Sequence, residues 1–102
     1  MSVKTALATA LNDERAAKQR TDALQELSTL RLAPEELDSV AAIVADPKPP
    51  ASVRRSALNV LQVAQFANPN FPKWRKKFTA LLVKLLDDKD ADLRGLSLDA
   101  LR

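Results

Sequence analysis

The sequence contains no cysteine and no histidine, and it has one glycine, one tryptophan and no tyrosine. Without cysteine the chain has no disulfide, no zinc–thiolate site and no thiol nucleophile. Without histidine it lacks the side chain that most often serves as a general base or a metal ligand. These absences exclude most hydrolytic chemistry, and we expect neither an enzyme nor a bound cofactor.

Long apolar runs are also missing. A helix needs roughly 20 mostly apolar residues to span a bilayer, and no such run and no signal-like segment near Met1 occurs in the sequence. We therefore expect no membrane association. An intracellular, cytoplasmic protein is the expected class, with a nuclear location left open.

The composition favours helices. Aromatic residues make up only 4% of the 102 residues, whereas hydrophobic residues make up 46%. A core of Leu, Val and Ala suits helices better than sheets, and a chain of this length forms one domain. The sequence predicts a single all-α domain.

Three segments of the chain resemble one another: QRTDALQEL (19–27), VRRSALNVL (53–61) and LRGLSLDAL (93–101). Each has apolar residues at helical spacing behind an arginine, and these arginines are Arg20, Arg54 and Arg94. An aspartate-bearing turn precedes each segment, with Asp13, Asp46 and Asp87. Because a further apolar stretch precedes each turn, every unit is predicted to be a helical hairpin.

Prolines separate the predicted helices. DPKPP (46–50) and ANPNFP (67–72) interrupt helices, and Pro34 followed by two glutamates is typical of a helix start. The expected helices lie at 2–11, 14–31, 35–45, 51–66, 72–87 and 91–101. They form three units at about 1–32, 33–68 and 69–102.

The stretch DKDADLRGLSLDAL (88–101) has two interpretations. Its alternating aspartates match the ligand positions of a calcium loop, but such a loop needs glycine at its sixth position, which here is Leu93. Apolar residues at helical spacing follow Leu93, and they favour the second interpretation. In that interpretation Asp90 or Asp92 caps the N-terminus of a helix.

The three units resemble HEAT repeats, an armadillo-like family of antiparallel helix pairs. The resemblance covers nearly the whole chain and implies a right-handed α-solenoid of three hairpins. It also implies hydrogen bonds between a turn aspartate and an arginine of the second helix, which here are Asp13 with Arg20, Asp46 with Arg54, and Asp87 or Asp88 with Arg94. The extra prolines of 46–50 weigh against the second of these pairs. The function implied by the resemblance is a protein-binding scaffold without catalytic residues.

The two ends of the expected solenoid differ. The apolar stripe of the first unit is narrow, as suits a terminal unit, whereas the third unit reaches Leu101 and Arg102 without a polar closing helix. Terminal repeats need a polar outer face. We therefore expect either a longer solenoid of which this is the N-terminal part, or self-association through the uncapped C-terminal end.

One row of residues on each second helix points away from the predicted core. The row consists of Thr21, Gln25, Ser28, Arg55, Asn59, Gln62, Gly95, Asp99 and Arg102. Its mixed charge favours a protein partner over a polyanion, although an ordinary solvated face would look the same. Phe66 lies near this direction, where it either anchors a partner or packs on the 67–72 loop. The predicted partner-binding residues are Gln25, Arg55, Asn59, Gln62, Phe66 and Asp99.

The net charge of +3 is concentrated in FPKWRKKF (71–78), whose cations are Lys73, Arg75, Lys76 and Lys77. Cations in the first turns of a helix oppose its dipole, so this stretch is a candidate site for a nucleic acid or an acidic surface. The alternative is that the cations are merely solvated. Trp74 and Phe78, at i and i+4, are predicted core residues, with base stacking as the alternative role of Trp74. Nucleic-acid binding is the alternative function, although the other two units have no basic row.

Overall fold

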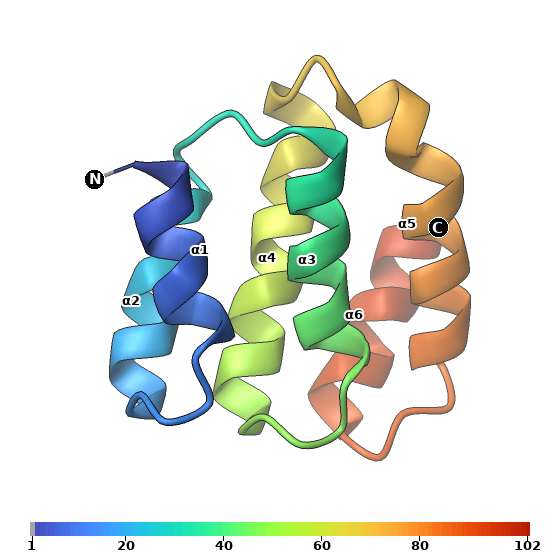
Figure 1. Cartoon of the computed structure of the whole chain (residues 1–102). Coiled ribbons are helices and arrows are strands. Elements are labelled where there is room, and N and C mark those ends of the chain that lie inside the picture. Colours follow the sequence, from blue (N-terminus) through green and yellow to red (C-terminus); the bar gives the residue numbers. More distant parts are fainter. Residues whose placement is uncertain (1) are drawn as a thin grey trace.

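The computed structural model describes residues 2–102, in which it has six α-helices and no strand. The all-α prediction is confirmed. The helices are α1 (Val3–Leu11), α2 (Ala17–Leu27), α3 (Pro34–Ala45), α4 (Ala51–Ala67), α5 (Phe71–Leu85) and α6 (Ala91–Leu101) (Figure 1).

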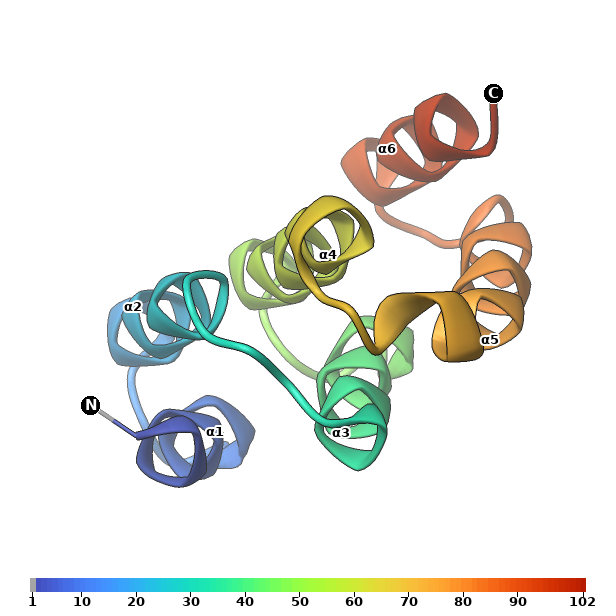
Figure 2. The same cartoon turned by 90° about the horizontal axis from the view of Figure 1, so that it is seen from above.

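Consecutive helices pack in pairs, and the pairs stand side by side. α1 packs on α2, α3 on α4 and α5 on α6, while α2–α4, α4–α6, α1–α3 and α3–α5 contacts join one pair to the next. Seen from above, α1, α3 and α5 form one layer and α2, α4 and α6 the other (Figure 2). The described part of the chain measures 33 × 30 × 16 Å.

The core lies between the two layers. Its largest fully buried side chains are Phe71, Leu24, Leu27, Leu32, Leu37, Leu58, Leu61, Leu85, Leu93, Val40, Val44 and Val53. Burying each such side chain stabilises the fold by about 1.5–3 kcal/mol relative to exposure. The three resembling segments thus bury the leucines that recur in them, except at the C-terminal end.

Side-chain hydrogen bonds mark the starts of α3 and α6. Asp90 accepts a hydrogen bond from the Leu93 backbone N–H at 2.9 Å and begins α6, which confirms the capping interpretation of 88–101. Glu36 accepts from the Ala33 N–H at 2.7 Å and begins α3, in which Pro34 is the first residue. Both caps satisfy backbone donors that the first helical turn leaves without a partner.

The second helix is shorter than the expected 14–31. It begins at Ala17 and ends at Leu27. At its C-terminal end, the Ser28 hydroxyl donates to the Gln25 carbonyl and the Thr29 hydroxyl to the Glu26 carbonyl. Serine and threonine that bond to nearby carbonyls compete with helix propagation, which accounts for the early end.

The C-terminal pair exposes apolar side chains that its counterparts bury. Leu98 of α6 is 47% exposed, although the leucines aligned with it in sequence, Leu24 and Leu58, are fully buried. Val83 of α5 is 55% exposed. The exposure of Leu98 follows from its position, because among the described helices α6 packs on α4 and α5 only. Self-association through this surface stays a prediction.

No helix within residues 2–102 is both long enough and apolar enough to cross a membrane.

Candidate functional site

A shallow groove of about 540 Å³ runs between α2 and α4 on the outer face of their layer. It is lined by Thr21, Gln25, Ser28, Ser52, Arg55, Ser56 and Asn59. These residues recur every three or four positions on their helices and therefore share one face. The groove brings together Gln25, Arg55 and Asn59, three of the six residues predicted to bind a partner.

Ion pairs hold Arg55 in place at one end of this groove. One of its guanidinium nitrogens lies 2.8 Å from the Asp92 carboxylate and 3.5 Å from that of Asp90, both at the start of α6. The Arg55 side chain is 36% exposed. Because the two carboxylates lie beside its guanidinium, the groove presents mainly hydroxyl and amide groups rather than a free positive charge.

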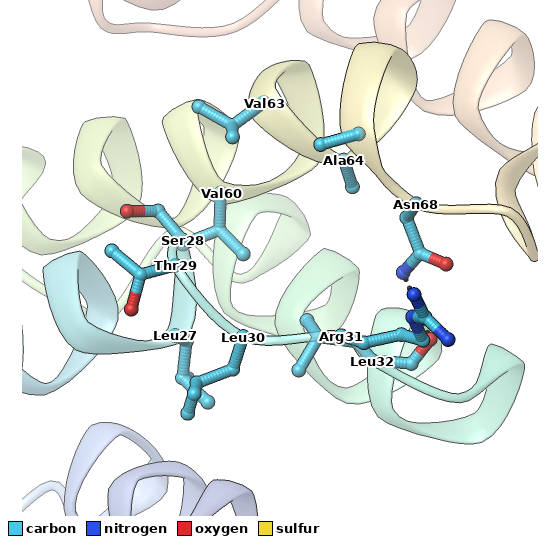
Figure 3. A pocket seen from close by; sticks show the side chains of 11 residues that line it. Leu27, Ser28, Thr29, Leu30, Arg31, Leu32, Val60, Val63, Ala64 and Asn68 are labelled. Carbon is cyan, nitrogen blue, oxygen red and sulfur yellow. Dashed lines mark hydrogen bonds between the residues drawn. The ribbon is translucent and has the colours of Figure 1, made fainter.

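A second pocket of about 190 Å³ is lined mainly by apolar residues and shares Ser28 with the groove. It lies between the segment that follows α2 and the C-terminal half of α4 (Figure 3). Its lining residues are Leu27, Ser28, Thr29, Leu30, Arg31, Leu32, Val60, Val63, Ala64, Ala67 and Asn68. The Asn68 side-chain amide donates to the Leu32 carbonyl at 2.8 Å and fixes one end of the pocket. We call the polar groove and this pocket together the α2/α4 groove.

The other three predicted partner-binding residues lie outside the α2/α4 groove. Phe66 is 88% exposed near the end of α4, so it does not pack on the 67–72 loop. Gln62 is half-buried on the same helix, and Asp99 is exposed on α6. Phe66 therefore presents its aromatic ring to solvent, as a role in anchoring a partner requires.

The basic stretch divides between core and surface. Trp74 and Phe78 are each only 2% exposed, which confirms them as core residues and leaves no face of Trp74 free to stack on a base. The four cations Lys73, Arg75, Lys76 and Lys77 are exposed along α5. The Arg75 guanidinium lies 5.4 Å from the centroid of the Phe71 ring. Binding of a nucleic acid or an acidic surface by these cations stays a prediction.

Asp38 of α3 joins the basic stretch to the middle pair. Its carboxylate accepts from the Trp74 indole N–H at 2.7 Å and lies 3.2 Å from the Lys77 ammonium nitrogen. The Trp74 hydrogen bond, and after it the Lys77 hydrogen bond, lower the pKa of Asp38 below its ordinary value. Sequence reasoning missed Asp38 because its partners lie in the next unit.

The arginines of the three units make different contacts. Arg54 is only 5% exposed; it donates to the Val44 carbonyl and makes a bidentate pair with Asp88, at 2.6 and 3.0 Å. Arg20, also 5% exposed, donates through Nε to the Ala10 carbonyl at 3.0 Å. Arg94 is exposed and donates to the carbonyls of Asp88 and Lys89.

The expected aspartate–arginine pairs therefore do not form as the resemblance implied. Within residues 2–102, Asp13 and Asp87 make no side-chain hydrogen bond, and Asp46 accepts only from the Lys48 backbone N–H. Arg54 instead reaches across to Asp88 in the next turn. The residues that occupy equivalent places in the three turns are Asn12, Asp46 and Asp88, since each accepts from the backbone N–H two residues later. Asn12 was missed because the neighbouring Asp13 matched the pattern better.

The pKa of Asp88 is lowered below its ordinary 3.8, chiefly by the hydrogen bonds from Arg54. A carboxyl group whose pKa is depressed by folding contributes stability above its unfolded pKa, and this contribution is lost as pH falls through the folded pKa.

We accordingly expect the free energy of unfolding, measured by urea titration, to decrease as pH falls below about 4. Replacing Asp88 by asparagine should reduce this decrease, because the protonation of this group then no longer opposes folding. The matched control is Asp87→Asn, at an exposed carboxylate without an ion pair in the described chain. A profile that Asp88→Asn leaves unchanged would contradict the assignment.

In the part of the chain that the structure describes, no group of three or more acidic, histidine or cysteine side chains is placed to hold a metal ion. The aspartates at 88, 90 and 92 are instead engaged by Arg54, by Arg55 and by the start of α6.

Comparisons of the chain with protein-family models, with curated proteins and with solved structures gave no match. The interpretation of the site therefore depends on its own geometry.

Proposed function

We propose that this protein is a HEAT-like α-solenoid of three helix pairs, at about 1–32, 33–68 and 69–102, stacked with a right-handed twist. Two observations support the proposal. The helix pairs stand side by side in two layers, as repeats that contact only their neighbours do. In addition, the buried Arg54–Asp88 pair joins the turn of one unit to the second helix of the preceding one.

We further propose that the protein is a non-catalytic scaffold that binds a segment of a partner protein along the α2/α4 groove. The observation that carries this proposal is that the polar groove and the pocket share the lining residue Ser28, so one elongated ligand could occupy both. The side chains that line the polar part are hydroxyls, amides and one neutralised arginine, which suit hydrogen bonding rather than proton transfer.

The chemistry of the groove fits an extended peptide. Gln25 and Asn59 lie on facing helices, and each side-chain amide offers both a donor and an acceptor to the partner's peptide groups. The pocket at Leu30 and Val63 would hold an apolar side chain of the same segment. Phe66 lies outside the groove but precedes the lining residue Ala67, and its exposed ring would add an aromatic contact to the same partner.

Selection of binders from a random peptide library displayed on phage tests the proposal directly. Peptides selected on the wild-type protein are then measured against Asn59→Arg, which fills the groove, by fluorescence anisotropy. We expect the affinity to fall about tenfold or more, as for a substitution at the centre of an interface.

The matched control is Thr79→Arg, which adds the same side chain at an exposed position of α5, away from the groove. It should leave the affinity unchanged. Selected peptides that bind both variants as tightly as wild type would place the binding surface elsewhere, and a library that yields no binder would argue against a peptide ligand.

A further inference from the structure

A third cavity lies at the intra-pair turns and shares no lining residue with the α2/α4 groove. It measures about 380 Å³ and is lined by Leu11, Asp13, Arg20, Ala42, Ile43, Asp46, Lys48, Pro49 and Pro50. One wall is apolar, and Leu11 on it is 46% exposed. Arg20 and Lys48 contribute positive charge to the lining, while Asp13 and Asp46 contribute negative charge.

Arg20 makes fewer hydrogen bonds than its counterpart Arg54. Both arginine residues are 5% exposed, and both donate to the carbonyl ten residues earlier. The two terminal nitrogens of Arg54 also bind the Asp88 carboxylate. The two terminal nitrogens of Arg20 have no hydrogen-bond partner among residues 2–102. In these residues the one fully buried side-chain polar atom without a partner is Ser97 Oγ, so the Arg20 nitrogens are not fully buried. The free nitrogens of Arg20 therefore reach solvent through the cavity.

The residue that could have filled the cavity does not pair with Arg20. Asp46 occupies the place of Asp88 and, like it, accepts from the backbone N–H two residues later, here that of Lys48 at 3.0 Å, but it makes no ion pair with Arg20. Pro49 and Pro50, which follow it, line the cavity. The nearly buried Arg20 thus faces an open cavity. The equivalent place beside Arg54 is occupied by the Asp88 carboxylate.

We propose that this cavity binds the carboxylate of an acid with an apolar stem. The carboxylate would take the bidentate position on Arg20 that Asp88 takes on Arg54, since planar guanidinium and carboxylate groups match in this geometry. Lys48 would add a favourable charge, and the apolar stem would lie on Leu11 and the prolines. The acid is either a free aliphatic acid or the C-terminal residue of a peptide.

The side-chain Nε–H resonance of Arg20 provides the test, because this N–H is buried and hydrogen-bonded to the Ala10 carbonyl. In ¹H–¹⁵N NMR spectra, titration with hexanoate or with N-acetyl-leucine should shift the Arg20 signal with saturation. The Arg54 signal is the internal control and should stay in place. Tighter binding of hexanoate would indicate a free acid, and tighter binding of N-acetyl-leucine a peptide C-terminus.

Two variants sharpen the test. Asp46→Asn keeps an oxygen for the Lys48 N–H but removes a negative charge from the cavity, so the affinity should rise roughly three- to tenfold. Arg20→Lys removes the bidentate donor and should abolish saturable shifts of the backbone amides of Leu11 and Ala42. Sodium chloride at matched ionic strength should produce no such shifts.

The proposal is overturned if the Arg20 signal does not respond to either acid. Equal shifts of the Arg20 and Arg54 signals, or equal shifts with sodium chloride, would also overturn it. None of these outcomes depends on peptide binding in the α2/α4 groove.

Discussion

Replacing Phe71 by alanine is expected to lower the free energy of unfolding by about 3–5 kcal/mol. Phe71 is fully buried, and its ring centroid lies 5.2 Å from that of Phe78 and 5.8 Å from that of Trp74. The loss combines the transfer of the ring to water with the cavity that it leaves. Because a domain of this size is stable by roughly 5–15 kcal/mol, the variant should unfold at a markedly lower urea concentration.

Phe66→Ala is the matched control for this measurement, since it removes the same ring from an 88% exposed position. We expect the free energy of unfolding to change by less than about 0.5 kcal/mol. The same variant should weaken binding of peptides selected on the wild type. If Phe66→Ala were as destabilising as Phe71→Ala, the exposed position of Phe66 would be wrong.

Replacing Asp88 by alanine is expected to lower the free energy of unfolding by about 3 kcal/mol. The substitution leaves the guanidinium of Arg54, whose side chain is 5% exposed, without its charged partner. It also removes the acceptor for the Asp90 backbone N–H, and so loosens the turn before α6. Urea unfolding monitored by circular dichroism measures the change.

The control is Asp87→Ala, which removes the adjacent exposed carboxylate and should change stability by less than about 0.5 kcal/mol. Replacing Arg54 by methionine in the Asp88→Ala background should recover part of the loss, because the buried charge is then gone. If Arg54→Met lowered the free energy of unfolding as much in the Asp88→Ala background as in the wild type, the two residues would act independently.

Much of the helix pattern could be predicted from local features. Prolines at 47, 49 and 50 and in the 67–72 loop interrupt helices by removing N–H donors, so α3, α4 and α5 lie within a few residues of their expected places. Asp90 could be identified, beside Asp92, as a candidate cap because both directly precede an apolar run at helical spacing. The end of α2 was less predictable, since side-chain bonds from Ser28 and Thr29 compete with weak helix propensity.

The candidate site was predictable only in part. Helical spacing placed Gln25, Arg55 and Asn59 on outward faces, and the structure brings them to one groove. Helical spacing could not reveal that Arg55 pairs with Asp90 and Asp92. Those partners belong to another helix pair, and their distance from Arg55 depends on how the pairs stack.

The sequence by itself determined the helical class, the positions of most turns and the apolar faces, because these depend on backbone restrictions and periodicity within single segments. Only the tertiary structure decided which carboxylate each buried arginine meets. Arg54 finds Asp88 whereas Arg20 finds none among residues 2–102. The reason is physical: an ion pair between units depends on how two separate helix pairs pack, and features within a single segment do not specify that packing.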